Sequence, residues 1–529
     1  MTDKIKRFFI TISIIELIIL ILTLLYNGST NTNLHVGRRY YITHMMRDQL
    51  LTKEQPALTT KPHILLIVAD DLGFYDVGYH GSRIKTPNID RLALSGVRLE
   101  NYYVQPICTP TRGQLLTGRY QIHTGLQWLL WPTTPYGLTL DNPTIADKLK
   151  EAGYATHMVG KWHLGFYKKE YLPTYRGFDS FFGFLNGHSD YYNHSVEYKD
   201  MNGYDLFEND HPANISKYTG SYSTTLFTAK VRDTIQNHNT EKPLFIYLSY
   251  QAVHSPLQVP KRYVDLNKNI NKRMKIRRQY AGMVTCMDES VGNVVDAMKE
   301  RGLWDNTLLI FTTDNGGDIE RGASNWPLKG EKGCLYEGGI RAVGFVNSPL
   351  LGEQVAGSVS NELLHVTDWF PTLLNLAGGN VSGSNPLDGF DQWKTIKYGL
   401  QSPRKEILHD INPRVTAPGK PLYNDTFNTT TRASLRMGDW KIITGYSVSG
   451  PSAPSASTKT STALHKPLLF NINIDPNEKI DMSERFPDIT RHMLKRLEYY
   501  QSGMVKCHYP SGDPLADPSL RNGFWQPWK

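Results

Sequence analysis

Cysteine is scarce in this chain: only four occur among 529 residues, and they lie far apart. No CxxC pair is present, and no cluster of His and Cys has the spacing of a zinc finger. If Cys108 is chemically active, three cysteines remain, and an odd number cannot all pair within the chain. The pattern argues against a zinc finger and against disulfides as a main source of stability. The sequence also lacks the internal repeats that mark solenoids and propellers.

A strong charge of one sign is missing from most of the chain. The net charge is +8, but residues 1–61 contain eight Lys and Arg against four Asp and Glu, so half of the excess lies in this segment. The remaining residues carry only a mild positive excess. This distribution predicts a local site for an anionic ligand rather than a surface that binds nucleic acid.

One long apolar run is present, at residues 8–25, and basic residues precede it. It has the pattern of either a signal peptide or a membrane-spanning anchor. Its length favours the anchor, whereas Glu16 disfavours it because an acid inside the bilayer is costly. Both alternatives direct the protein into the secretory pathway. The same compartment is indicated by six glycosylation sequons, at Asn27, Asn193, Asn214, Asn380, Asn424 and Asn428.

The alternation of apolar and polar segments predicts the domain organisation. After the signal or anchor (1–26), residues 27–60 are polar and aperiodic, as expected of a linker. Residues 61–412 alternate buried strands with helices, which predicts an α/β domain with a largely parallel sheet between helices. Residues 413–529 open with a stretch rich in Pro, Ser, Thr and Gly and contain short strand-like pieces, which predicts a smaller α+β subdomain.

Polar residues follow four of the predicted strands, just past their C-terminal ends. In open α/β sheets this edge is where ligands bind. The strands and the residues that follow them are 64–69 with Asp70 and Asp71, 154–159 with Lys161 and His163, 244–250 with His254, and 308–313 with Asp314 and Asn315.

The stretch from Cys108 to Arg119 predicts a helix that begins beside a reactive residue. Pro110 suits the first turn of a helix, because its missing N–H would be unpaired there anyway. Cys108 would then lie at the N-terminus, where backbone N–H groups favour negative charge, and Arg112 would lie one turn further on. A lone cysteine is more often a structural core residue, but the strand ends above favour a nucleophile in an anion site.

The remaining candidates divide into metal ligands and cationic groups. Asp70, Asp71, Asp314 and Asn315 offer hard oxygen ligands, which suit Ca²⁺ or Mg²⁺ rather than Zn²⁺. An anionic ester needs its charge neutralised and its leaving oxygen protonated, and Lys and His do both. The candidates for these tasks are Lys161, His163, His254 and Lys332. Isolated histidines such as His80, His123 and His188 receive no role.

Several spaced motifs resemble the sulfatase family. Cys108-Thr109-Pro110-Thr111-Arg112, followed by Leu115-Leu116-Thr117-Gly118, resembles the family's CxPxR signature, with Thr111 in place of the commoner serine. Gly160-Lys161-Trp162-His163-Leu164-Gly165 resembles the second signature. The arylsulfatase B branch in particular is resembled by Asp314-Asn315-Gly316-Gly317, by Asn325–Gly330 and by Tyr336–Arg341. The resemblance covers about residues 62–529.

The resemblance implies a fold, an activity and a set of roles. The fold would be an alkaline-phosphatase-like sandwich with a large mixed, mostly parallel sheet and a C-terminal antiparallel sheet. Cys108 would be oxidised to formylglycine by a formylglycine-generating enzyme, and its hydrate would attack the sulfur of a sulfate ester. The ester would belong to an aryl sulfate or a saccharide such as N-acetylgalactosamine 4-sulfate of dermatan or chondroitin sulfate.

The resemblance also implies what each site residue would do. One Ca²⁺ would be bound by Asp70, Asp71, Cys108, Asp314 and Asn315. Arg112 and Lys161 would orient the hydrate and the sulfate, whereas His254 and Lys332 would bind the ester and protonate the leaving oxygen. His163 would help to release sulfate. The implied location is the lysosome, with the extracellular space or the ER lumen as alternatives.

Two alternatives stay open from the sequence. A phosphatase or phosphodiesterase of the alkaline-phosphatase superfamily would share the fold, but usually has a Ser or Thr nucleophile and two transition metals. A non-catalytic glycoprotein that binds sulfated glycans would keep the pocket without the chemistry. The cysteines that form disulfides in animal arylsulfatase B have no evident partners here, and an anchor at residues 8–25 would not suit a soluble lysosomal enzyme.

Overall fold

The computed structural model describes residues 60–352, 354–449, 460–464 and 466–529. The apolar run at 8–25, nearly all of the expected linker and Asn27 lie outside the described residues. Among the helices that are described, none has both the length and the apolar character that crossing a membrane requires.

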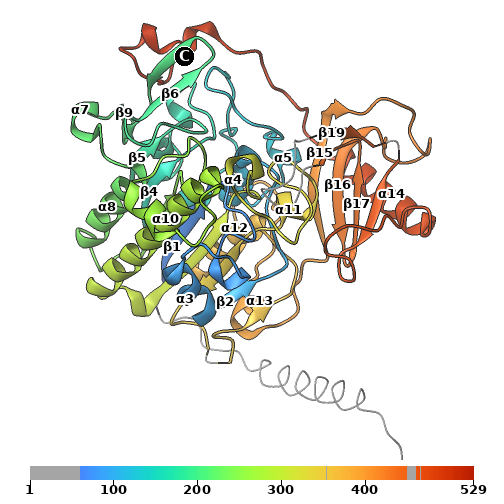
Figure 1. Ribbon diagram of the computed structural model, residues 1–529, viewed down its shortest axis with the longest axis horizontal. Coiled ribbons are helices and arrows are strands. Elements are labelled where there is room, and N and C mark those ends of the chain that lie inside the picture. Colours follow the sequence, from blue (N-terminus) through green and yellow to red (C-terminus); the bar gives the residue numbers. More distant parts are fainter. Residues whose placement is uncertain (1–59, 353, 450–459, 465) are drawn as a thin grey trace, which may run out of the picture. The chain divides into compact units, whose positions relative to one another are not determined.

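A ten-stranded sheet forms the centre of the large domain (Figure 1). Strands β11, β1, β10, β4 and β5 pair in parallel, and the outer pairs β11–β12, β12–β2, β5–β8 and β8–β9 are antiparallel. In sheet order the strands are β13 (Val359–Ser360), β2 (Val97–Leu99), β12 (Gly344–Asn347), β11 (Thr307–Thr313), β1 (His63–Ala69), β10 (Leu244–Ser249), β4 (Ala155–Lys161), β5 (Ser180–Phe184), β8 (Phe207–Glu208) and β9 (His211–Pro212). The expectation of a mixed, mostly parallel sheet is confirmed.

The central strands are buried along their whole length because helices cover both faces of the sheet. Every residue of β1, β10 and β11 is buried, which explains why their sequences are continuous apolar runs. One face packs against α3 (Pro87–Ser95), α8 (Ser223–Gln236) and α10 (Lys275–Glu300). Cys286 lies on α10 within this core and is fully buried. The helices α4 (Cys108–Thr117), α6 (Ile145–Glu151) and α12 (Trp369–Leu376) pack against one another elsewhere in the domain.

One observed helix start differs slightly from the start expected at proline. Residues 142–143 suggest a start there, but α6 begins at Ile145, because Thr144 and Asp147 form a reciprocal capping box one residue earlier. Helix α4 begins at Cys108, after an extended Ile107, and Pro110 lies in its first turn, as the sequence predicts. Cys108 therefore occupies the first position of the helix.

The second, smaller sheet is antiparallel and packs against a long helix. It contains β15 (Glu406–Thr416), β16 (Thr431–Met437), β17 (Trp440–Thr444) and β20 (Leu468–Asn471). Helix α14 (Pro487–Ser502) covers one face with Met493, Leu494 and Leu497. Strand β15 runs through residue 412, so the chain enters the small sheet before the boundary that composition suggests. The short hairpin β18 (Tyr446–Ser449) and β19 (Thr460–Ala463) lies beside this sheet.

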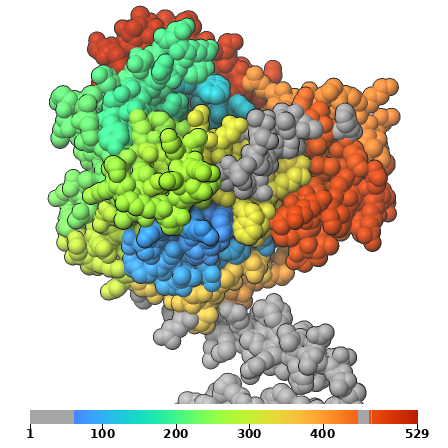
Figure 2. Space-filling view, viewed as in Figure 1, coloured from blue at the N-terminus to red at the C-terminus, as the bar shows by residue number. Residues whose placement is uncertain are grey.

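The C-terminal tail leaves α14 and returns to the large domain. Figures 1 and 2 show its last residues, in red, lying against the green hairpin of β6 (Ser195–Tyr198) and β7 (Met201–Tyr204). Trp525 is fully buried there, and its indole N–H donates to the carbonyl of Val196 at 3.0 Å. The other short elements are β3 (Tyr102–Tyr103), β14 (Leu364–His365), α5 (Gln121–Thr124), α7 (Ile215–Tyr218), α9 (Lys261–Leu266), α11 (Glu337–Ile340) and α13 (Trp393–Tyr398).

A buried cluster of charges joins the large domain to the small sheet. The ammonium of Lys441, on β17, lies 2.9 Å from a carboxylate oxygen of Glu337 on α11 and 2.7 Å from one of Glu478. All three side chains are fully buried. Burial, and then the charge of Glu337, raise the pKa of Glu478 to about 7.

Candidate active site

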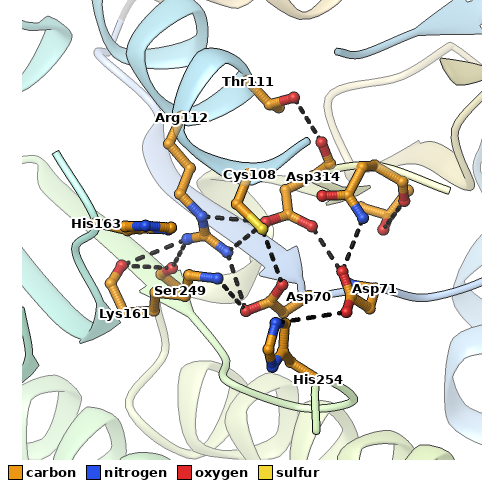
Figure 3. A network of polar contacts seen from close by, with 12 residues as sticks. Asp70, Asp71, Cys108, Thr111, Arg112, Lys161, His163, Ser249, His254 and Asp314 are labelled. Atoms are coloured by element: carbon orange, nitrogen blue, oxygen red, sulfur yellow. Dashed lines mark hydrogen bonds and ion pairs between the residues drawn. The ribbon is translucent and has the colours of Figure 1, made fainter. Parts of the chain in front are cut away.

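Cys108 lies at the first position of α4, beside the C-terminal edge of the large sheet. Its Sγ is buried and lies 3.7 Å from an oxygen of Asp70 (Figure 3). Burial, and then the charge of Asp314, raise the pKa of the Cys108 thiol well above its usual range. The thiol is therefore neutral at physiological pH, and this environment does not favour a thiolate nucleophile despite the helix N-terminus.

Three carboxylates gather around Cys108 because strands β1 and β11 are neighbours in the sheet. Ala69 pairs with Thr313, so Asp70 and Asp71, which follow β1, come next to Asp314, which follows β11. One potential ligand atom from each of Asp70, Asp71, Asp314 and Cys108 lies within 4.8 Å of the others. Figure 3 shows these four side chains pointing toward a common centre.

The cluster has the properties of a cation site. Burial, and then the charge of Asp314, raise the pKa of Asp70 to about 7, against the opposite effect of Lys161. Burial also opposes ionisation of Asp71, but Lys332 and His254 outweigh it and hold the pKa of Asp71 well below its usual value. The Asn315 amide donates to Asp71 at 2.8 Å, while its fully buried Oδ1 has no hydrogen-bond partner among the described residues. Carboxylates and an unpaired amide oxygen form an oxygen donor set that fits Ca²⁺.

Arg112 lies behind the carboxylates and is fully buried. Its Nη2 and Nε donate to the same oxygen of Asp314, at 2.8 and 3.1 Å, and Nη2 lies 3.6 Å from Asp70. Its Nη1 donates to the hydroxyl of Ser249 and to the carbonyl of Lys161. Arg112 thus ties together residues from the ends of β1, β4, β10 and β11, the four strands that the sequence singled out.

Two lysines pair with the two adjacent carboxylates that follow β1. The ammonium of Lys161, the last residue of β4, lies 2.6 Å from Asp70 and is fully buried. The ammonium of Lys332 lies 2.7 Å from Asp71, and its pKa is raised, chiefly by Asp71 and against the effect of burial. Three cationic side chains therefore balance three carboxylates in the pocket, so a divalent cation would leave it with a net positive charge that suits an anionic ester.

His254 lies beside Asp71, on the loop that follows β10. Its Nε2 is 3.6 Å from a carboxylate oxygen of Asp71, and its Nδ1 donates to the carbonyl of Ser255 at 2.6 Å. Burial, and then Lys332, lower its pKa well below the usual value. With Nδ1 used by the backbone, Nε2 is the nitrogen that faces the cluster.

His163 is held as a neutral ring whose Nδ1 is bare. Its Nε2 contacts the carbonyl of Leu130 at 3.0 Å, which assigns the proton to Nε2 because a carbonyl only accepts. Nδ1 is buried without a hydrogen-bond partner in the described part of the chain. Burial, and then Lys161 and Arg112, lower the pKa of His163 well below its usual value. A buried neutral imidazole with a free lone pair can act as a proton acceptor.

The path that places His163 differs from the expected one. Two residues apart on an extended segment, Lys161 and His163 would point to the same side. The structure ends β4 at Lys161, and His163 has a positive φ of 57°. A left-handed turn, rather than an extended segment, directs the two side chains into the pocket.

Two residues join the site that the sequence patterns did not assign. The ring of His188 stacks on that of His254 with centroids 5.9 Å apart, and burial, followed by the charges of Lys161 and Lys332, lowers the pKa of His188 to about 4. Ser249 bridges Arg112 and the carbonyl of Lys161, to which it donates at 2.8 Å. Ser249 is the last residue of β10, so its position at a strand end was a usable signal; His188, on a loop after β5, had none.

Five of the six sequon asparagines lie within the described residues, and all five are exposed. In four of them the asparagine Oδ1 accepts a hydrogen bond from the residue two positions later. These four are Asn193, Asn214, Asn380 and Asn428.

Comparisons with known proteins identify the family to which this site belongs. The sequence model of the family described as Sulfatase matches residues 62–379. Arylsulfatase J of Mus musculus is 48% identical over 490 residues, which cover 89% of this chain and 81% of that protein. N-acetylgalactosamine-6-sulfatase of Sus scrofa is 30% identical over 495 residues, which cover 88% of this chain and 90% of that protein. The crystal structure of Ps i-CgsB in complex with k-i-k-neocarrahexaose is 31% identical with a TM-score of 0.71, covering 87% of this chain and 97% of that chain. The chain belongs to the sulfatase family and is a sulfuric ester hydrolase.

Proposed function

We propose that this protein is a formylglycine-dependent, Ca²⁺-dependent sulfatase that removes the 4-sulfate of N-acetylgalactosamine residues in dermatan or chondroitin sulfate. The observation that carries the proposal is the buried cluster of Asp70, Asp71, Asp314 and Cys108, with lysines paired to two of its acids. A saccharide substrate is supported by relatives, since one is an N-acetylgalactosamine-6-sulfatase and another was crystallised with a neocarrahexaose.

The proposed ligands of Ca²⁺ are Asp70, Asp71, Asp314, Asn315 and residue 108. The unpaired Oδ1 of Asn315 and the raised pKa of Asp70 both support a cation at this place. When bound, the ion supplies positive charge that stabilises negative oxygen atoms of the nucleophile and the ester. Arg112 positions Asp314 through two hydrogen bonds and Asp70 through an ion pair, and it orients the nucleophile and the sulfate.

Cys108 is proposed to be converted to formylglycine by a separate formylglycine-generating enzyme. The hydrated aldehyde would supply one hydroxyl to attack sulfur and a second to release the sulfate, which a serine could not do. Mass spectrometry of the tryptic peptide that contains residue 108 should show formylglycine in protein from the secretory pathway. Unmodified cysteine in an active preparation would contradict this chemistry.

The surrounding side chains take roles that follow from their protonation states. Lys161 and Lys332 hold the ester oxygens, and Lys332, whose pKa is raised, carries the proton that the leaving oxygen needs. His254 binds the ester beside Lys332 through Nε2 in its protonated form, because Nδ1 already donates to the carbonyl of Ser255 and an ester oxygen accepts only from an Nε2–H; the negative charge of the ester favours that protonation. His163, neutral and with a bare Nδ1, accepts the proton of the second hydroxyl as the bond between the Cβ of residue 108 and the ester oxygen breaks, so that sulfate leaves with that oxygen and the aldehyde forms again.

A panel of defined saccharides tests the substrate. The purified protein should release sulfate from a disaccharide carrying N-acetylgalactosamine 4-sulfate and from 4-nitrocatechol sulfate, and Cys108→Ala should abolish both activities. The panel should also contain the 6-sulfated isomer and a phosphate monoester. Faster turnover of the 6-sulfate would overturn the substrate, and preference for the phosphate monoester would overturn the reaction.

The proposed location follows from the same chemistry. The exposed sequons and the proposed modification of Cys108 both support a location of the folded domain in the secretory pathway. Within that pathway we propose the lysosome, where sulfated glycans are degraded.

A further inference from the structure

An aromatic pair, one ring exposed and the other half-buried, lies beside the proposed sulfate pocket. Trp131 is 48% exposed, which is unusual for the largest apolar side chain. Its ring lies nearly parallel to that of Tyr198, with an interplanar angle of 23° and centroids 5.9 Å apart. The two rings come from distant segments, since Tyr198 ends strand β6. We call these two residues the aromatic platform.

The platform is continuous with the reaction site. Trp131 follows Leu130, whose carbonyl accepts from His163, and Trp131, His163 and Asn186 line one small hollow. The chain that follows Asn186 passes directly over the ring of His163 at Gly187. One residue later it reaches His188, which stacks on His254. A substrate whose sulfate lies between His163 and His254 would therefore extend along this strip toward Trp131.

The two sides of the platform are braced by the C-terminal tail. The amide of Asp513 donates to the carbonyl of Thr133 at 2.8 Å. The hydroxyl of Tyr509 donates to the carbonyl of Trp128, also at 2.8 Å. Further along, the indole of Trp525 donates to Val196 in the strand that carries Tyr198. The same tail thus holds both segments, so the two rings are positioned before any ligand binds.

We propose that Trp131 and Tyr198 form a sugar-binding subsite, on which a pyranose ring of the sulfated saccharide stacks. An aromatic face suits the apolar C–H face of a sugar, and the exposed indole of Trp131 offers such a face while the stacked Tyr198 ring holds it in place. The ammonium of Lys199 lies 5.3 Å from the centroid of the Tyr198 ring and places a positive charge at the edge of the platform. That charge suits a polyanionic glycan better than a neutral one. The subsite rests on the proposed function, because it presupposes a saccharide ester.

Kinetics of single variants test the subsite. For hydrolysis of a sulfated chondroitin disaccharide, Trp131→Ala should raise KM about tenfold with kcat changed less than about twofold. Tyr198→Ala should raise KM by a smaller factor, and Trp131→Phe should recover most of the loss. Tyr499→Ala removes an exposed ring from α14, on the far side of the small domain's core, and serves as the control with unchanged KM.

Inhibition by inorganic sulfate separates a subsite from a structural role. Sulfate occupies only the anion pocket, so its inhibition constant should be the same in the wild type and in Trp131→Ala. An unchanged KM for the disaccharide would overturn the proposal, and so would a parallel rise of KM and of the sulfate inhibition constant.

Binding without turnover keeps this test separate from that of the activity. In a Cys108→Ala background, calorimetry with the same disaccharide should show an affinity that Trp131→Ala weakens about tenfold. Equal affinity of the two proteins would overturn the subsite whatever the activity. If the disaccharide binds through Trp131 but the wild type releases no sulfate, the subsite stands and the proposed reaction fails.

Discussion

The chemistry of single residues in this site is decided by what surrounds them. Cys108 has the helix N-terminus and the nearby arginine that usually lower a thiol pKa, yet burial and Asp314 raise it. His163 and His188 both enter the site from loops, but only His163 belongs to a motif. A sequence pattern can assign residues that a motif or a strand end marks, whereas His188 is placed by the course of a loop, which no local pattern encodes.

Gly187 is predicted to position His163. A Cβ at residue 187 would lie 2.8 Å from Cε1 and 2.9 Å from Nε2 of the His163 ring, so Gly187→Ala must displace the ring from the carbonyl of Leu130. We expect kcat for 4-nitrocatechol sulfate to fall about tenfold to hundredfold, because small misplacements of reacting groups are costly. Gly503→Ala is the matched control, since its nearest neighbour would be 3.7 Å away. Equal kcat in both variants would show that the ring position tolerates the change.

At the level of elements, the ends of neighbouring strands build the site. The four strands that carry polar ends, β11, β1, β10 and β4, prove to be consecutive in the sheet. Their buried apolar runs and the residues that follow them could be predicted from the sequence. The order of the strands in the sheet could not be predicted, because it depends on long-range pairing such as that of Ala69 with Thr313. This order determines which acidic residues lie next to one another.

Calcium is predicted to stabilise the ends of β1 and β11. Asp70, Asp71 and Asp314 repel one another, and an ion that binds only the folded state adds stability by mass action, about 2.7 kcal/mol at a concentration one hundredfold above Kd. Removal of Ca²⁺ with EGTA should lower Tm in a thermal-shift assay, and added Ca²⁺ should restore it. Asp314→Asn, which removes one ligand charge, should reduce the response. A Tm that is insensitive to Ca²⁺ in the wild type would argue against the site.

At the level of the whole molecule, the small sheet is attached to the large domain through charges as well as apolar contacts. Lys441 on β17 pairs with Glu337 on α11 and with Glu478, all fully buried. The existence of the small domain could be predicted from its composition, but this attachment could not. It joins Glu337, which lies in the Tyr336–Arg341 motif, to Lys441, which lies 104 positions further on in a segment without a motif.

Glu478 is predicted to make this attachment sensitive to pH. Its pKa is raised from 4.5 to about 7, so its contribution to stability is complete below about pH 4.5 and is lost as the pH rises through 7. The Tm of Glu478→Gln, measured relative to that of the wild type, should therefore rise by a few degrees from pH 5 to pH 8, because only the wild type loses stability over this range. Glu484→Gln, which alters an exposed pair with Lys466, is the control with a constant difference. A constant difference for Glu478→Gln as well would contradict the assignment.

The complete burial of α4 has a consequence for the order of events in the cell. Every residue of this helix is buried, and Cys108 is only 1% exposed. A modifying enzyme cannot reach such a side chain once the domain has folded. Under the proposed conversion, oxidation and folding therefore compete in time, and the competition is settled during synthesis. A molecule that folds first keeps its thiol permanently, so the active fraction of a preparation records how fast the chain was modified and not how stable the enzyme is.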